Sequence, residues 1–362
     1  MPKGDKSVTI KDIAALCGVS VSTVSNVLND KTNKVSRDVA AKVHEVIAQT
    51  GYKPNYLAKG LRATQTKTLG IIAEDLIIFS TSPIIEGVMQ SCEDAGYSVV
   101  IENMRLFGRW EGGWMHDENR FQSVLSAVMD KMNGLNVDGI IYIGSYEHVV
   151  NIDKSSTSLP IIMVYARPSD NSIPCFVLDD EAGGCMAYEY LLNKGHKRIG
   201  VITGEADNIH TVHRLRGINR AMFNAGLLYD PSLIEHRSWN KQGGYEGIKN
   251  LIKQNITAVF CMSDQIASGV YEYLAEEGLK PGEDLSIMGY DNHELTTFLS
   301  PELTTVALPL EKLGKETANR MLKAVDKNLT ITGTESAVES EPNVWCICGD
   351  VVERLSIRQL DN

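Results

Sequence analysis

The sequence lacks the short motifs that mark the common enzyme classes. It contains no GxGxxG after a predicted strand, no GxxxxGKS or GxxxxGKT, no GxSxG and no HExxH, and its eight histidines are scattered. Its seven cysteines lack paired zinc-ligand spacing, and Cys346 and Cys348 alternate along a strand-like run, which favours buried thiols over a metal or redox pair. We therefore predict no enzyme activity, no catalytic residues, no cofactor and no metal.

Long apolar runs are also missing. No stretch reaches membrane-spanning length, and the first residues, MPKGDKSVTIKD, lack the apolar core of a secretory signal. An apolar fraction of 43% with 22% charged residues is typical of a soluble globular protein, and 362 residues suffice for two or three domains. We expect a cytoplasmic protein with no membrane partner.

Positive charge is scarce outside the N-terminal region. Residues 1–67 hold eleven Lys or Arg against five Asp or Glu, whereas the rest of the chain has a net charge of −17 and the whole chain −11. A basic module attracts phosphate groups, and an acidic body repels DNA. The division therefore predicts that nucleic acid is contacted by the N-terminal module only.

Residues 8–29 are predicted to form two short helices joined by a tight turn. Apolar residues recur at helical spacing, and these are Ile10, Ile13, Ala14 and Cys17 in the first helix and Val24, Val27 and Leu28 in the second. Thr9 and Ser20 stand at the expected N-caps, and Gly18 ends the first helix. A third helix over residues 37–50, capped by Ser36, would close a small core. The first two helices alone fit either a DNA-binding helix-turn-helix or an ordinary helical hairpin.

Three stretches in order favour the DNA-binding interpretation. TIKDIAALCGVSVSTVSNVLN, KVSRDVAAKV and GYKPNYLAKGLR together resemble the headpiece and hinge of the lactose-repressor/galactose-repressor (LacI/GalR) family. The resemblance implies an all-α helix-turn-helix headpiece over residues 1–53 and a hinge over residues 54–67. It also implies a homodimer on near-palindromic double-stranded operator DNA.

From residue 68 the pattern changes to short apolar strands alternating with amphipathic helices, which predicts two doubly wound α/β subdomains facing each other across a cleft. NKGHKRIGVITG, RLRGINRAM, SDQIASGV, GLKPGEDLSIMGYDN and LTTVALPLEKLGKETA extend the family resemblance, whose core is similar to periplasmic sugar-binding proteins. We place subdomain one at about 68–166 and 301–332 and subdomain two at about 167–300 and 333–362. The strand in CFVLDD and the strand from Val344 are thereby assigned to subdomain two, and the helix Pro309 to Lys327 to subdomain one.

The resemblance also implies DNA contacts. Val21, Ser22 and Asn26 would touch base edges, and the Asn26 amide suits adenine where many members carry an arginine that suits guanine. Leu61 would be an apolar wedge in the minor groove, with Ala58 lining the same contact. The other predicted contacts, mostly to phosphates, are Thr9, Ser20, Thr23, Ser25, Ser36, Asn55 and Lys59. The alternative for Thr9, Ser20 and Ser36 is a role as helix N-caps alone. The alternative for the hinge is a flexible linker, which is what we expect when DNA is absent.

The effector site implied by the resemblance consists of Asp75, Ser80, Tyr165, Arg214, Trp239, Asp264 and Asp291. Arg214 offers a planar donor fork suited to a pair of hydroxyls or an oxo group, and Trp239 would stack on a flat face of the ligand. Asp264 and Asp291 end strands that face the cleft, while Tyr165 stands where many members carry Asp. The alternatives are a helix N-cap for Asp264 and a structural ion pair for Arg214 or Asp291.

Two stretches depart from the family pattern. Residues 74–83 replace the usual polar sequence with Ile77, Ile78 and Phe79, so we expect a less polar pocket than that of a simple hexose binder. Residues 103–122 contain what looks like an insertion of about a dozen residues. Trp110 and Trp114 in this insertion would either belong to a packed surface loop or cover the cleft.

The combined prediction is a sequence-specific, DNA-binding transcriptional regulator, a repressor whose operator affinity a small ligand controls allosterically. A sugar or sugar derivative is the expected effector, because the cleft resembles that of sugar-binding proteins. The alternatives are a purine-type co-repressor and a sugar-binding protein without a regulatory role.

Overall fold

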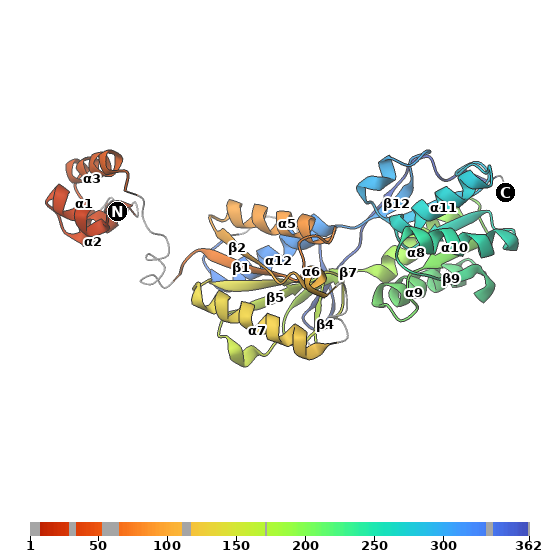
Figure 1. Ribbon diagram of the computed structural model, residues 1–362, viewed down its shortest axis with the longest axis horizontal. Coiled ribbons are helices and arrows are strands. Elements are labelled where there is room, and N and C mark those ends of the chain that lie inside the picture. Colours follow the sequence, from red (N-terminus) through yellow and green to blue (C-terminus); the bar gives the residue numbers. More distant parts are fainter. Residues whose placement is uncertain are drawn as a thin grey trace, which may run out of the picture. The chain divides into compact units, whose positions relative to one another are not determined.

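The computed structural model describes residues 8–28, 34–52, 65–110, 117–170, 172–330 and 336–360. The chain forms two compact units that divide between Thr66 and Lys67 (Figure 1). No helix in these ranges is long and apolar enough to cross a membrane. Four residues of the predicted DNA interface lie outside the described residues, and these are Asn55, Ala58, Lys59 and Leu61.

The described part of the first unit consists mainly of the helices α1 (Ile10–Cys17), α2 (Val21–Leu28) and α3 (Arg37–Thr50). The Asp12 carboxylate accepts hydrogen bonds from the backbone N–H and the hydroxyl of Thr9, at 2.8 and 2.7 Å, and fixes the start of α1. Gly18 follows α1 with a φ of +68°, which glycine adopts without strain. The predicted apolar faces meet in one core, whose buried members are Ile13, Ala14, Cys17, Val24, Val27 and Val43.

Two large sheets form the frame of the second unit, with strand orders β13-β14-β7-β5-β3-β1-β2 and β15-β12-β11-β10-β8-β9. Only β13 with β14 and β12 with β15 pair antiparallel among the described strands. The strands are β1 (Thr68–Ala73), β2 (Ser98–Asn103), β3 (Gly139–Ile143), β4 (Val149–Val150), β5 (Ile161–Val164), β6 (Arg167–Pro168), β7 (Cys175–Leu178), β8 (Ile199–Thr203), β9 (Ile234–His236), β10 (Ala258–Cys261), β11 (Ser286–Asp291), β12 (Thr304–Ala307), β13 (Val338–Glu341), β14 (Val344–Ile347) and β15 (Val351–Val352). Strands β4 and β6 form a separate small pair.

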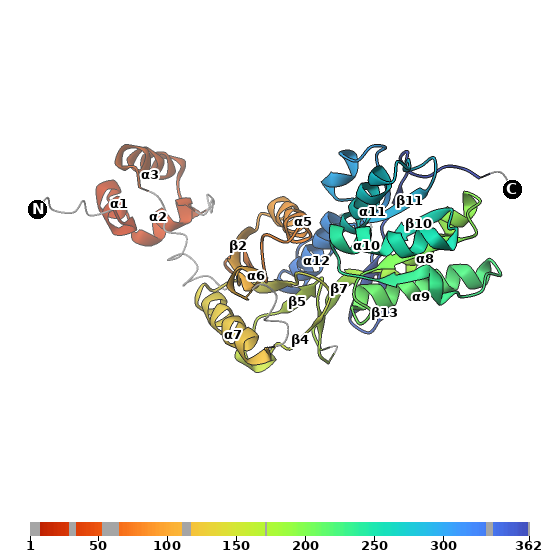
Figure 2. The same cartoon turned by 45° about the vertical axis from the view of Figure 1, so that its right-hand side comes forward.

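Helices cover both faces of each large sheet, as Figures 1 and 2 show. On the first sheet, α5 (Thr81–Asp94) and α12 (Leu310–Val325) share one apolar cluster, and α7 (Glu118–Gly134) packs on the other face. On the second sheet, α8 (Asp180–Asn193) and α9 (Ile209–Asn224) lie opposite α10 (Lys241–Leu251) and α11 (Asp264–Glu276). Because both faces are covered, the central strands β3, β5, β7 and β10 are almost wholly apolar, and the predicted doubly wound architecture is confirmed.

Several strands join a different sheet from the one predicted. Strand β12, within the 301–332 segment assigned to subdomain one, pairs with β11 and β15 in the second sheet, and β13, assigned to subdomain two, pairs with β14 in the first sheet. Strand β7, within CFVLDD, pairs with β5 and β14 in the first sheet, so its assignment to subdomain two is wrong. The strand from Val344 also belongs to the first sheet, and the chain returns to the second sheet only at β15. An apolar strand can pair with any sheet edge that offers free N–H and C=O groups, so its hydrophobic pattern does not identify its sheet. The helix expected at Pro309 to Lys327 is observed as α12 on the first sheet, as predicted.

The insertion at residues 103–122 contains the short helix α6 (Leu106–Trp110) before α7 begins. Leu106 is buried, and Trp110 packs against the apolar cluster beneath α7. Trp114 lies outside the described residues. For Trp110, this packing favours the surface-loop interpretation over a cover for the cleft.

Candidate functional site

The residues predicted to read bases lie on α2. Ser22 is exposed, and Ser25 and Asn26 are half-buried. Val21 is also half-buried and packs against the headpiece core, so only part of its side chain is open to a base. These positions leave polar atoms along one side of α2, from Ser22 in its first turn to Asn26 in its second half, and a helix-turn-helix directs the N-terminal end of this helix into the major groove.

The predicted phosphate contacts surround the helix starts. The Ser20 hydroxyl accepts a hydrogen bond from the Thr23 N–H at 3.1 Å and lies 2.7 Å from the Ser22 hydroxyl. Ser20 therefore acts as the N-cap that the sequence predicts, within a cluster of hydroxyl groups at the start of α2. Thr9 and Ser36 occupy the N-cap positions of α1 and α3 and are exposed, but the Ser36 side chain makes no cap hydrogen bond among the described residues.

The centre of the second unit holds a buried ion pair between α9 and α8. Arg214 is only 2% exposed, and its Nε donates to Asp180 Oδ1 at 2.7 Å while its Nη1 donates to the Met262 carbonyl at 2.5 Å. The guanidinium also lies 3.7 Å from the centre of the Tyr290 ring. The helices approach this closely because Gly184 has no side chain, since a Cβ there would lie 2.4 Å from the Arg214 carbonyl oxygen. The structural ion pair left open as an alternative for Arg214 is thus present.

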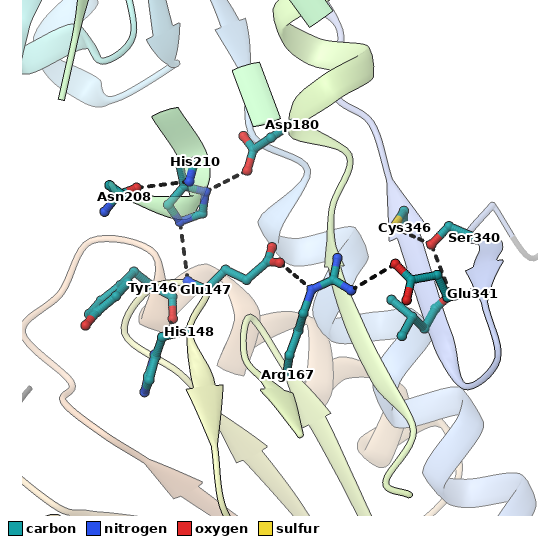
Figure 3. Close-up of polar contacts among 11 residues, drawn as sticks. Tyr146, Glu147, His148, Arg167, Asp180, Asn208, His210, Ser340, Glu341 and Cys346 are labelled. Carbon is teal, nitrogen blue, oxygen red and sulfur yellow. Dashed lines mark hydrogen bonds and ion pairs between the residues drawn. The ribbon is translucent and has the colours of Figure 1, made fainter. Parts of the chain in front are cut away.

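His210 extends this ion pair towards the first sheet, as Figure 3 shows. Its Nδ1 lies 2.6 Å from Asp180 Oδ2, and its Nε2 lies 3.3 Å from the backbone nitrogen of Glu147. Burial favours the protonated form of Asp180, but the neighbouring Arg214 and His210 outweigh it and hold the pKa of this carboxyl well below its ordinary value. Asp180 is therefore ionised and accepts hydrogen bonds from both neighbours.

Asp264 holds a loop. Its Oδ2 accepts from the His293 N–H and its Oδ1 from the Thr305 hydroxyl, both at 2.7 Å. The N-cap interpretation fails for Asp264 itself, because the preceding Ser263 accepts from the Ile266 N–H and caps α11. Both carboxylate oxygens of Asp264 already have partners, so its proposed contact with a ligand would require one of these bonds to be shared.

Asp291 is half-buried at the end of β11 with a φ of +118°, a conformation that L residues rarely adopt. Burial and the neighbouring Asp264 carboxyl raise the pKa of Asp291 well above its ordinary value. Burial likewise raises the pKa of Asp264, to about 7, because it outweighs the hydrogen bonds from Thr305 and His293. The two carboxyl groups therefore form a proton-binding pair at the edge of the second sheet.

The remaining predicted residues fall into two groups. The Tyr165 ring lies 5.5 Å from the His210 ring, and the Trp239 ring lies 5.7 Å from the Arg214 guanidinium, so both gather around the ion pair. Asp75, by contrast, accepts from the backbone N–H groups of Ile77, Phe107 and Gly108, and the Ser80 hydroxyl donates to the Ser145 carbonyl. Asp75 and Ser80 thus hold loops and the start of α6.

The loop that departs from the family pattern is partly exposed. Ile77 is 69% exposed and Phe79 is 40% exposed. The Phe79 ring lies 5.7 Å from the ring of His293, which follows β11 of the second sheet. An apolar loop of the first subdomain therefore contacts the second subdomain.

Three residues at this site were missed from the sequence, namely Glu147, Asp180 and His210. Asp180 follows the strand in CFVLDD, and an acidic residue after a parallel strand is a signal for a site at the sheet edge. His210 and Arg214 are four residues apart and share one helix face. No group of three or more His, Cys, Asp or Glu in the described ranges is arranged to hold a metal ion.

The carboxyl pair predicts a pH dependence of stability. Both groups bind a proton more tightly in the folded protein than in the unfolded one, so protonation stabilises the fold and this stabilisation is lost as the pH rises through the folded-state pKa. Between pH 5.5 and 8 the free energy of unfolding should fall by at least about 2 kcal/mol, which is the contribution of Asp264 alone, measured by urea denaturation. Asp291→Asn should reduce this fall and the exposed Asp94→Asn should not. A free energy of unfolding that rises over this range would contradict the assignment.

Comparison with known proteins extends the resemblance over most of the chain. The family described as bacterial regulatory proteins, lacI family, matches residues 9–55, and the periplasmic binding protein-like domain matches residues 188–356. The chain is 35% identical to the ribose operon repressor of Escherichia coli over 315 residues, which are 85% of this chain and 90% of the relative. It is 32% identical to the HTH-type transcriptional repressor PurR of Haemophilus influenzae over 323 residues, which are 88% of this chain and 91% of the relative.

Solved structures have the same fold. A lac repressor dimer bound to operator and the anti-inducer ONPF has a TM-score of 0.75 at 22% identity, covering 98% of this chain and 100% of that chain. A LacI family transcriptional regulator from Enterococcus faecium with bound ribose has a TM-score of 0.60 at 24% identity, covering 81% of this chain and 100% of that chain.

Proposed function

Because this chain belongs to the lacI family of bacterial regulatory proteins, we propose that it represses transcription from an operator bound by its headpiece, under the control of a small ligand held between its two large sheets. The observation that carries this proposal is the presence, in one chain, of a helix-turn-helix and of a buried polar cluster that touches both subdomains. A ligand that prefers one arrangement of the subdomains would shift the cost of ordering the two hinges on DNA. The protein would act in the cytoplasm as a homodimer on a near-palindromic site.

The charges around Arg214 favour an uncharged, hydroxyl-rich ligand. Arg214 is already paired with Asp180, and Arg167 is paired with Glu147 at 2.5 Å. The Oε2 atom of Glu147 is buried without a hydrogen-bond partner among the described residues, and a buried unpaired acceptor costs about 1–3 kcal/mol. Hydroxyl groups can donate to such an oxygen, whereas a phosphate would meet carboxylates. We therefore propose a neutral sugar, for which Trp239 offers a flat stacking surface.

A thermal-shift panel on the full chain tests the ligand class. The panel contains neutral pentoses, hexoses and disaccharides, the corresponding sugar phosphates, and purines. A ligand present at a hundred times its Kd should add about 2.7 kcal/mol, which shifts the Tm by several degrees. A neutral sugar should shift the Tm and its phosphate should not. A Tm shift with purines alone would show that the ligand is a purine-type co-repressor and not a sugar. The absence of a Tm shift with every compound of the panel would refute the proposed ligand class.

Base recognition by α2 is tested by Asn26→Arg. A side-chain amide pairs with adenine and a guanidinium with guanine, so the variant should change the preferred base at one position of each half-site by about 1–3 kcal/mol. Competition binding with operators selected from a random pool measures this preference. Gln49→Arg, which adds the same charge on the exposed side of α3, is the control and should raise affinity for all sequences alike. An unchanged preference in Asn26→Arg would remove Asn26 from the base contacts.

A further inference from the structure

The His210 side chain joins the two subdomains of the second unit. It projects from α9, which packs on the second sheet, and it is only 6% exposed. Its Nδ1 contacts Asp180, on α8 of the same subdomain, at 2.6 Å. Its Nε2 lies 3.3 Å from the backbone nitrogen of Glu147, in the segment that follows β3 of the first sheet. One imidazole therefore spans the boundary between the subdomains (Figure 3).

Both contacts require the neutral imidazole with its hydrogen on Nδ1. Ionised Asp180 can only accept, so Nδ1 must carry a hydrogen, and the Glu147 N–H can only donate, so Nε2 must be bare. Protonation of Nε2 would place two donors face to face. The charged and titratable side chains around the ring are the Asp180 carboxylate, whose other oxygen holds the Arg214 guanidinium, and the Tyr165 phenol, whereas Glu147 meets the ring through its backbone N–H.

The two residues that His210 contacts, Asp180 and Glu147, are each held by an ion pair within their own subdomain. On the second subdomain, Asp180 is held by Arg214. On the first, the Glu147 carboxylate pairs with Arg167, whose Nη1 lies 3.6 Å from Glu341 of the edge strand β13. Because both residues are held by ion pairs, the hydrogen bond at Nε2 resists a change in the separation of the subdomains at this point.

We propose that His210 is a positioning residue that holds the two subdomains closed on each other and thereby sets how readily the ligand site closes. The regulatory role of this contact rests on the proposed function. The hydrogen bond itself does not, because it can be measured without ligand or DNA. Loss of the Nε2 bond would populate a more open arrangement. A closed-state ligand would then bind about two- to tenfold more weakly, the range that one neutral hydrogen bond supplies.

Two substitutions of His210 each remove one of its two hydrogen bonds and keep the other. Gln at position 210 places its carbonyl oxygen near the position of Nε2 and can still accept from Glu147, but it loses the bond to Asp180. Asn is shorter, so it keeps a donor towards Asp180 and cannot reach Glu147. His213→Gln, on the same helix and half-buried, is the matched control.

Amide hydrogen exchange of the peptide containing Glu147, in the ligand-free full chain, is the deciding measurement. His210→Asn should increase exchange at this amide at least severalfold, while His210→Gln and His213→Gln should leave it close to wild type. Equal exchange in His210→Asn and wild type would overturn the proposal, whether or not a sugar or an operator is found to bind.

Discussion

Arg214→Met should lower the free energy of unfolding of the second unit by about 3–5 kcal/mol, because removing one partner of a buried ion pair leaves the other charge uncompensated. The partner is Asp180, which is 1% exposed and, among the described residues, keeps His210 as its one side-chain hydrogen-bond donor once the guanidinium is gone. Urea denaturation of the full chain measures the effect. The same variant should lose its response to the ligand.

A double variant separates these two consequences. Asp180→Asn combined with Arg214→Met removes both charges, and such neutral replacements recover much of the lost stability. The double variant should therefore unfold at nearly the wild-type urea concentration and still fail to respond to the ligand. A response in the double variant would show that Arg214 does not bind the ligand, and wild-type stability in Arg214→Met alone would show that the ion pair does not support the fold.

Ile13→Ala should abolish operator binding without weakening ligand binding. Ile13 is fully buried in the headpiece core, and truncating such a side chain costs about 2–5 kcal/mol. A headpiece of this size has a small core and little stability to lose, so this loss should unfold it. Operator binding and the ligand-induced shift in Tm are the two measurements.

Leu16→Ala is the matched control for this experiment, because Leu16 lies on the same helix and is 59% exposed. It should change headpiece stability by no more than about 0.5 kcal/mol. Retained operator binding in Ile13→Ala would contradict the buried position of this residue. Loss of ligand binding in the same variant would contradict the division of the chain between Thr66 and Lys67.

Features that depend on neighbouring residues could be predicted from the amino-acid order. The apolar spacing of Ile13 and Cys17, with Thr9 before and Gly18 after, predicts α1 with its boundaries. The alternation of apolar strands with amphipathic helices predicts two doubly wound sheets, because this pattern leaves each sheet two faces to bury. The family resemblance adds Arg214 and Trp239, which lie close together in the structure.

Features that depend on contacts between distant residues required the folded protein. Strand β7 joins the first sheet through backbone hydrogen bonds to β5 and β14, and its own sequence is equally suited to either sheet. Asp75 holds α6 because an insertion about 30 residues away brings N–H groups to it, which no local pattern reveals. Asp180 and His210 flank Arg214 only because α8 and α9 pack closely at Gly184. Local periodicity thus accounts for the helices and strands, whereas the proposed ligand site arises from side chains that only tertiary packing brings within hydrogen-bond distance.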